Sequence, residues 1–237
     1  PWCMLLLSAI VIQLLAKPCG WSRQSTGALM LIVPIGNTSF MGVPMVNAFF
    51  GEAGIPHLIL YDQIGTMLIF ATYGSIILSI YTGESTRIRT IALRALLFPP
   101  TTALLVGLLL REWPYPQALV TALESLAGAL TPLVMTAIGF QMTLRLRPTT
   151  LSPLGSGLAV KLIIAPVAAL LGCRLFGFNT LAADIAIFEA GMPPMVTASA
   201  LAAAAGLGVE LAIALAGLGI ILAFATLPLL YALIQYF

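Results

Sequence analysis

The chain has 237 residues, of which 60% are hydrophobic and only 8% are charged, and its mean hydropathy is +1.08. Soluble domains carry about 25% charged residues, so this composition excludes a water-soluble fold, and it excludes disorder for the same reason. The net charge is only +2 and no basic run is present, so a nucleic-acid partner is not expected.

The apolar runs are continuous over about 20 residues, which favours membrane-spanning helices over the alternating strands of about 10 residues found in membrane barrels. We therefore predict an all-α polytopic membrane protein. Eight segments qualify as spans, and in chain order they are 1–16, 26–50, 56–81, 91–110, 117–140, 154–176, 179–204 and 209–236. The chain begins with Pro1 and Trp2 inside the first segment, so we expect a longer protein that starts upstream.

Basic residues are distributed unequally between the two sides of this arrangement. One set of alternate connections carries seven of them: Lys17, Arg23, Arg87, Arg89, Arg94, Arg145 and Arg147. The other set carries only Arg111 and Arg174. The positive-inside rule then predicts that the seven-rich side is cytoplasmic and that the C-terminus lies outside.

Two segments share a short motif. Residues 44–48 read Pro-Met-Val-Asn-Ala and residues 194–198 read Pro-Met-Val-Thr-Ala, so four of five positions match. The two segments cross in opposite directions, which predicts an inverted repeat of five helices, with chance similarity as the alternative. Residues 1–81 would then end repeat one and residues 82–237 would form repeat two.

Helix-breaking residues accompany both motifs: Pro34 and Pro44 in one segment, and Pro193 and Pro194 in the other, remove backbone donors and are expected to open the helices. Matching interruptions in two halves point to a transporter site. Half-helices that begin at the membrane midplane offer free N–H groups and a positive dipole end, so we expect an anionic substrate there.

Three ionisable residues lie within predicted spans, where such groups are functional candidates by default. Glu189 precedes the second break and is interpreted as a proton or cation ligand, with a capping role as the alternative. Asp62 is interpreted as a site or relay group, or equally as an interfacial anchor. Lys161 either pairs with Glu189, attracts an anion, or extends towards the interface.

The motifs resemble those of the auxin efflux carrier family, which includes bacterial malate and malonate permeases. The resemblance lies in Gly36-Asn37-Thr38-Ser39-Phe40-Met41-Gly42-Val43-Pro44, Tyr61-Asp62-Gln63, Pro99-Pro100, Lys161-Leu162-Ile163, Glu189-Ala190-Gly191-Met192-Pro193-Pro194 and Leu227-Pro228. It implies a fold of ten helices, of which this chain holds helices three to ten, with the two broken helices crossing at their prolines.

The same resemblance implies an elevator carrier, in which segments 91–140 form the scaffold and a homodimer surface while the remaining segments, including 154–237, move as a core. The candidate substrate-binding residues are Asn37, Thr38, Ser39, Pro44, Asn47, Met192, Pro193, Pro194 and Thr197. The candidate ion-coupling residues are Asp62, Gln63, Lys161 and Glu189.

We therefore predict a secondary active transporter for a small organic acid such as malate, coupled to H+ or Na+ and embedded in membrane lipid, in a bacterial inner membrane. A transporter-like sensor that binds without transport is the alternative. An enzyme is not expected, because His57 is the single histidine and no paired aspartates or Cys/His cluster exist in the sequence. No cofactor or metal is expected either.

Overall fold

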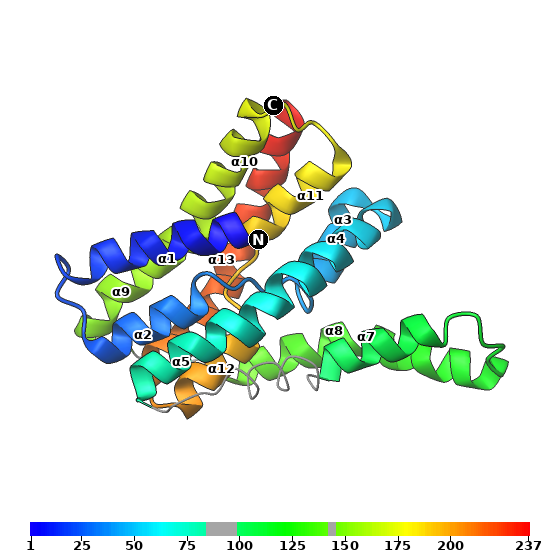
Figure 1. Ribbon diagram of the computed structural model, residues 1–237, viewed down its shortest axis with the longest axis horizontal. Helices are drawn as coiled ribbons and strands as arrows, with labels where there is room; N and C mark the ends of the chain where they lie inside the picture. Colours follow the sequence, from blue (N-terminus) through cyan, green and yellow to red (C-terminus); the bar gives the residue numbers. More distant parts are fainter. Residues whose placement is uncertain (84–98, 142–145) are drawn as a thin grey trace.

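The computed structural model describes residues 1–83, 99–141 and 146–237. Within these ranges every named element is helical, and extended pairing is limited to one isolated antiparallel bridge between Gly36 and Pro194. Figure 1 shows the helices in chain order, and the prediction of an all-α chain is confirmed for the described residues.

The first 83 residues form a short helix, a broken helix and a long helix that contains π-helical turns. The elements are α1 (Trp2–Ala16), α2 (Arg23–Ile32), α3 (Gly42–Phe50), the 3-10 turn η1 (Glu52–Gly54), α4 (Ile55–Leu60), the π-helical turns η2 (Tyr61–Met67) and η3 (Phe70–Gly74), and α5 (Ser75–Thr82). Local residues set the ends: the Ser25 backbone N–H donates to the Ser22 hydroxyl at the start of α2, and Gly83 takes a left-handed φ of 81° after α5.

The rest of the described chain follows the same pattern of helices. The elements are α7 (Pro99–Leu109), α8 (Gln117–Gln141), α9 (Pro148–Ala159), the π-helical turn η4 (Val160–Ile164), α10 (Ala165–Leu175), α11 (Leu181–Ala190), α12 (Val196–Ala204) and α13 (Val209–Tyr236). Helix therefore occurs in all eight predicted segments. The arginines Arg87, Arg89, Arg94 and Arg145 lie outside the described residues, as do positions 91–98 of the fourth segment.

Within the part of the chain that the structure describes, three continuous helices are long and apolar enough to cross a membrane, namely Glu52–Thr82 with 31 residues and Pro148–Leu175 and Val209–Tyr236 with 28 each. At 1.5 Å per residue, 28 residues span about 42 Å. The second and seventh predicted segments are each split into two halves of nine or ten residues, and each half reaches only about 15 Å. The total of eight spans stays a prediction.

Two tertiary contacts mark one end of the bundle. The Trp21 indole N–H donates to the Ser152 hydroxyl at 3.2 Å. The Arg147 guanidinium lies 3.5 Å from the Glu210 carboxylate. These contacts bring together the connections that follow the first, fifth and seventh predicted segments. Their alternate placement agrees with the predicted topology, and the assignment of this end to the cytoplasm stays a prediction.

A second set of contacts marks the opposite end. Arg174 in the last turn of α10 donates to the Ile234 carbonyl at 3.1 Å and to the Asp184 carboxylate at 2.9 Å. It also donates to Asn179 in the connection that follows. One guanidinium therefore joins α10, α11 and the last turn of α13, where a cation complements the helix dipole.

Most helices share one apolar core, whereas α7 and α8 project away from it (Figure 1). Core residues such as Leu29, Leu158, Phe188 and Leu215 come from α2, α9, α11 and α13. On the projecting pair, Leu109 is 83% exposed, which suits a surface in contact with lipid or protein rather than with water. The division into repeats and into scaffold and core stays a prediction.

Candidate functional site

The first break separates α2 from α3 over residues 33–41. Val33 still has helical torsions, and Pro34, which lacks a backbone N–H, then prevents the hydrogen-bond ladder from continuing. Pro44 does not belong to this break, which corrects the expectation that it opens the helix. It is the third residue of α3, in the first turn, where proline is tolerated because no intrahelical donor is needed.

The second break separates α11 from α12 over residues 191–195. Gly191 ends α11, and Pro193 and Pro194 follow before α12 begins at Val196. Two consecutive prolines remove two backbone donors, so this stretch cannot form a helical ladder. Its backbone must be satisfied elsewhere.

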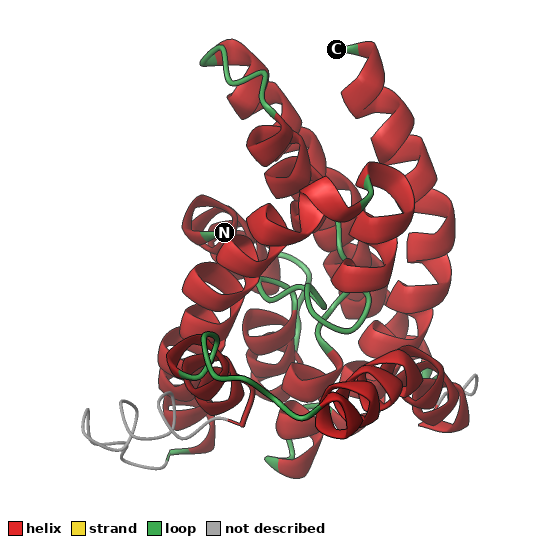
Figure 2. Cartoon of the chain, turned by 90° about the vertical axis from the view of Figure 1, so that its right-hand side faces the viewer, coloured by secondary structure: helices red, strands yellow, loops and turns green. Residues whose placement is uncertain are grey.

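The two breaks satisfy each other. The Asn37 N–H donates to the Pro193 carbonyl at 2.7 Å, and the Met195 N–H donates to the Ile35 carbonyl at 3.0 Å. Together with the bridge between Gly36 and Pro194, these bonds form a short antiparallel contact at the centre of the bundle, where Figure 2 shows the loops enclosed by helices. Non-helical backbone at membrane depth requires such enclosure. We call this contact the crossing.

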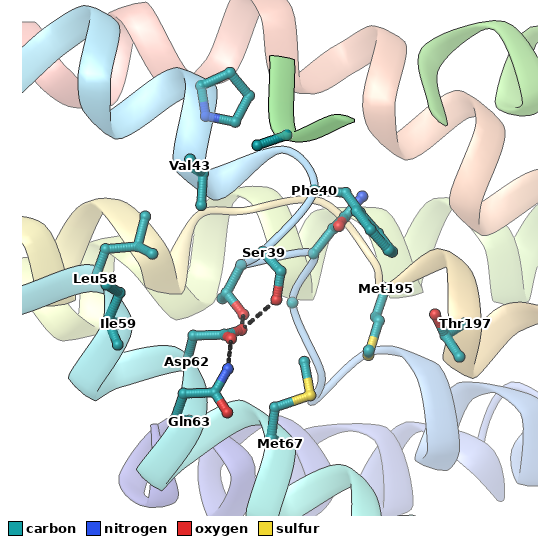
Figure 3. A pocket seen from close by; sticks show the side chains of 15 residues that line it. Ser39, Phe40, Val43, Leu58, Ile59, Asp62, Gln63, Met67, Met195 and Thr197 are labelled. Carbon is teal, nitrogen blue, oxygen red and sulfur yellow. Dashed lines mark hydrogen bonds between the residues drawn. The ribbon is translucent and has the colours of Figure 1, made fainter. Parts of the chain in front are cut away.

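A pocket of about 420 Å³ lies beside the crossing. Its polar wall consists of Asn37, Thr38, Ser39, Asp62, Gln63 and Thr197. Its remaining wall is mainly apolar and includes Phe40, Val43, Leu58, Ile59, Met67 and Met195, as Figure 3 shows. A mainly apolar cavity with a few converging polar groups is typical of a small-molecule site.

Asp62 accepts hydrogen bonds from three side chains at the edge of this pocket. It lies on the π-helical turn η2 and is 3% exposed. The Thr38 hydroxyl and the Ser39 hydroxyl (2.8 Å) donate to one carboxylate oxygen, and the Gln63 amide donates to the other at 2.8 Å (Figure 3). Three donors offset part of the cost of burying the carboxylate and fix the loop of the first break against η2.

The N-termini of the two half-helices differ in their free donors. In α3, the Gly42 and Val43 amides donate to the Asn37 and Ser39 carbonyls, and Pro44 has no N–H. In α12, no side chain caps the helix, and within the described residues no acceptor is bonded to the amides of residues 196–198. The expectation of two free helix ends is therefore wrong for α3, and the free amides belong to α12.

A second, much smaller cavity lies next to the crossing and is lined by Glu189. We call it the Glu189 chamber; its volume is about 10 Å³, and its lining includes Gly36, Thr38, Tyr61, Thr66, Lys161 and Glu189. Glu189 is fully buried, and neither carboxylate oxygen has a hydrogen-bond partner among the described residues. The side chain reaches the start of α3, because a methyl group placed on Gly42 would lie 2.8 Å from its Oε1.

Lys161 enters the Glu189 chamber from the π-helical turn η4. It is 4% exposed, and its ammonium donates to the Ala190 carbonyl in the last turn of α11 at 3.3 Å. The described residues form no ion pair between Lys161 and Glu189 within 4 Å. Lys161 is therefore neither directly paired nor extended to the interface, and it complements the negative end of the α11 dipole.

The predicted site residues divide into three groups in space. Those that line the pocket are Asn37, Thr38, Ser39, Pro44, Asp62, Gln63 and Thr197. Lys161 and Glu189 line the chamber, as Thr38 also does. Outside both cavities lie Asn47, which is exposed, and Met192, Pro193 and Pro194, which are buried in the crossing itself. Their roles in binding stay predictions.

Sequence reasoning did not single out the apolar pocket wall or Thr66 of the chamber. Met67 and Leu58 are ordinary apolar residues in an apolar chain, so nothing in the sequence distinguishes them. Thr66 lies five residues after Tyr61, about one turn of the π-helical η2, and both line the chamber. An α-helical period would not have grouped these two residues.

Comparison with known proteins places the chain in a class consistent with this geometry. Residues 2–231 match the family described as membrane transport protein. A transporter from Methanothermobacter thermautotrophicus, named as uncharacterized, is 30% identical over 224 residues, which cover 94% of this chain and 73% of that protein. A second uncharacterized transporter, from Methanocaldococcus jannaschii, is 26% identical over 187 residues, covering 72% of this chain and 56% of that protein.

The chain belongs to this membrane transport protein family, and the resemblance to auxin efflux carriers is thereby confirmed. It is an integral membrane protein of a transporter family. Both relatives come from archaea, and the expected bacterial inner membrane stays a prediction.

Proposed function

We propose that this protein is a secondary active transporter that carries a small organic anion, such as malate or another carboxylate, coupled to H+ or another cation. The observation that carries the proposal is the pocket at the crossing, which combines unused donors with an apolar wall. Its volume of about 420 Å³ falls within the range of small-molecule sites and suits a compact carboxylate.

Two groups in the pocket are suited to a carboxylate. Asn37 is 1% exposed, and its side-chain Nδ2 has no partner among the described residues. The unbonded amides at the start of α12 lie beside Thr197 and Met195 in the pocket wall. A helix N-terminus with free N–H groups binds anions through both hydrogen bonds and the dipole.

An elevator motion accounts for the division of the molecule. The helices that build the crossing share one apolar core, whereas α7 and α8 stand apart and reach the pocket through Ala127. In the proposed cycle, the core carries the crossing across the membrane while the pair α7 and α8 stays in place. A homodimer through the fixed pair belongs to the same proposal.

The proposal is tested by counterflow of labelled malate in proteoliposomes that contain the complete gene product. We expect saturable counterflow that Asn37→Ala reduces by about 100-fold, because the variant removes a buried donor to the substrate. Gln235→Ala, which removes an exposed amide at the end of α13, is the matched control and should retain wild-type counterflow. A panel of monocarboxylates and dicarboxylates extends the test beyond malate.

The alternative of a sensor gives a different result. If a carboxylate raises the melting temperature of the purified protein but none of the panel shows counterflow, the carrier proposal is overturned in favour of binding without transport. Flux that does not saturate would indicate a passive channel.

A further inference from the structure

Glu189 is in a state that calls for a functional explanation. Its side chain is fully buried and lacks donors for both carboxylate oxygens within the described residues. Burying an unpaired charge is among the most costly arrangements in a protein, and native structures rarely leave a buried polar group unsatisfied. The carboxyl group must therefore gain a proton or a partner during the working cycle.

The first turn of α3 forms a common wall between Glu189 and the substrate pocket. On one side, the Glu189 carboxylate lies against Gly42, where an added methyl group would come within 2.8 Å of Oε1. On the other side, Val43 and Pro44 line the pocket. The first turn of α3 therefore lies between a charge on Glu189 and a substrate bound in the pocket.

The charged groups around Glu189 give a simple balance. Lys161 on η4 and Tyr61 on η2 line the chamber together with Glu189. Asp62 lines the neighbouring pocket, and Thr38, which lines both cavities, donates to its carboxylate. With Asp62 and Glu189 as carboxylates and Lys161 as a cation, the net charge of the crossing is −1; with Glu189 protonated it is zero. An incoming anion is repelled in the first state and not in the second, and repulsion is strong where water is excluded.

Other titratable groups on the elements that pack against α11 do not line the chamber. They are Cys173 and Arg174 on α10, His57 on α4, Glu52 on η1, and Glu210, Tyr231 and Tyr236 on α13. Arg174 is held by Asp184 on α11 itself. Pro1 also lines the chamber but has no titratable side chain, so the balance of side-chain charge depends on Asp62, Lys161 and Glu189.

The chamber discriminates between a proton and a metal cation. Its volume of about 10 Å³ is at the lower limit for one water molecule, so it has no space for a hydrated ion. The Lys161 ammonium also lines it and would repel a second cation. A proton needs no such volume, since it binds directly to a carboxylate oxygen.

We propose that Glu189 binds the coupling proton and that protonation of Glu189 and binding of the substrate anion in the pocket favour each other. Asp62, which is held by three donors, stays a fixed charge and does not carry the proton. The proton and the anion then occupy the crossing together and move in the same direction. This proposal rests on the carrier function proposed above and names its coupling ion and its proton site.

The test measures the half-saturation concentration for labelled malate in counterflow, with equal pH on both sides, at about pH 6 and about pH 8. For the wild type, we expect half-saturation at least about 5-fold lower at the acidic pH, the lower end of usual coupling between two sites. Glu189→Gln, which imitates the protonated side chain, should show the low value at both pH values. It should keep counterflow but lose uphill uptake driven by a pH gradient. A pH dependence in this variant as large as that of the wild type would count against the assignment.

Two further variants make the result specific. Glu124→Gln removes an exposed carboxylate on α8 and should behave as the wild type. In Asp62→Asn, counterflow should fall while its pH dependence survives. The opposite pattern, in which pH dependence is lost in Asp62→Asn and kept in Glu189→Gln, would overturn the assignment.

The remaining outcomes separate the two proposals. The linkage alone is overturned if wild-type counterflow shows no pH dependence. It is also overturned if Glu189→Gln neither exchanges malate nor shows a higher melting temperature in its presence. A wild-type protein that exchanges none of the carboxylate panel overturns the proposed function, and the linkage with it.

Discussion

The two broken segments carry almost the same five residues, yet the half-helices that follow the breaks begin at different points of this motif. α3 begins at Gly42, two residues before Pro44, whereas α12 begins at Val196, two residues after Pro194. The first amides of α3 donate to carbonyls of its own loop, while those of α12 have no acceptor within the described residues. The difference shows that the backbone around a motif decides which helix end can serve a ligand.

The carboxylates next to the two breaks differ in the same way. Asp62 faces the first break from a neighbouring span and is stabilised by Thr38, Ser39 and Gln63. Glu189 belongs to the last turn before the second break and has no donor within the described residues. One break is thus built around a satisfied charge and the other around an unsatisfied one.

Removal of Lys161 should have the largest effect on stability, because its ammonium donates to the Ala190 carbonyl before the second break and also lies against Gly36 in the first. We expect Lys161→Met to lower the free energy of unfolding by about 3–5 kcal/mol, since it leaves buried carboxylates without compensating charge. The measurement is unfolding in mixed detergent micelles, with the exposed Lys17→Met as control. A loss similar to that of the control would refute a structural role for the ammonium at α11.

Paired threonine variants compare the two breaks directly. Thr38→Val removes a buried donor to the Asp62 carboxylate and should cost about 1.5–3 kcal/mol of unfolding free energy. Thr197→Val, at the matching end of α12, should change stability by less than about 0.5 kcal/mol, because its hydroxyl has no hydrogen-bond partner among the described residues. Equal losses in the same unfolding assay would show that the breaks are energetically alike.

A methyl group at Gly42 tests the close approach of Glu189 to α3. Gly42→Ala places a carbon 2.8 Å from a carboxylate oxygen, and we expect a loss of about 1–3 kcal/mol from overpacking. Gly155→Ala, on an exposed part of α9 with open space around the new carbon, should instead gain about 0.5–1 kcal/mol. If both variants stabilise the protein in thermal unfolding, the carboxylate does not occupy this position.

An ion pair far from the crossing should matter least. The side chains of Arg111 and Glu112 are 71% and 82% exposed, so Arg111→Ala should change the unfolding free energy by less than about 0.5 kcal/mol. This value provides the baseline for the variants at the crossing. A loss above about 1 kcal/mol in the same assay would mean that this connection is buried by a partner.

Several features of the fold followed from local sequence. Uninterrupted apolar runs predicted the helices α1, α8 and α13, because backbone N–H and C=O groups inside a membrane must form hydrogen bonds within their own segment. Pro34 and the pair at 193–194 predicted the two breaks. The placement of Pro44 did not follow, since proline fits the first turn of a helix as well as it breaks an interior, and only the helix start distinguishes the two.

The site was predictable to a different degree. The residue types Asn37, Thr38, Asp62 and Glu189 stood out because polar groups are costly at membrane depth. Their grouping into two cavities did not follow from sequence, because the crossing joins backbone atoms of Gly36 and Pro194, which are far apart in the chain. The apolar wall of the pocket carries no local signal at all in a chain that is 60% hydrophobic.

The sequence by itself determined that this protein folds in a membrane, where its helices and breaks lie, and which polar residues are candidates for burial. Each of these depends on hydrophobicity and backbone chemistry, which act locally along the chain. Only the tertiary structure decided that, among the described residues, Asp62 has three donors and Glu189 none, that Lys161 binds a carbonyl rather than a carboxylate, and that the free amides belong to α12 and not to α3. These properties depend on which groups meet across the crossing, and such contacts are set by packing between segments far apart in the chain.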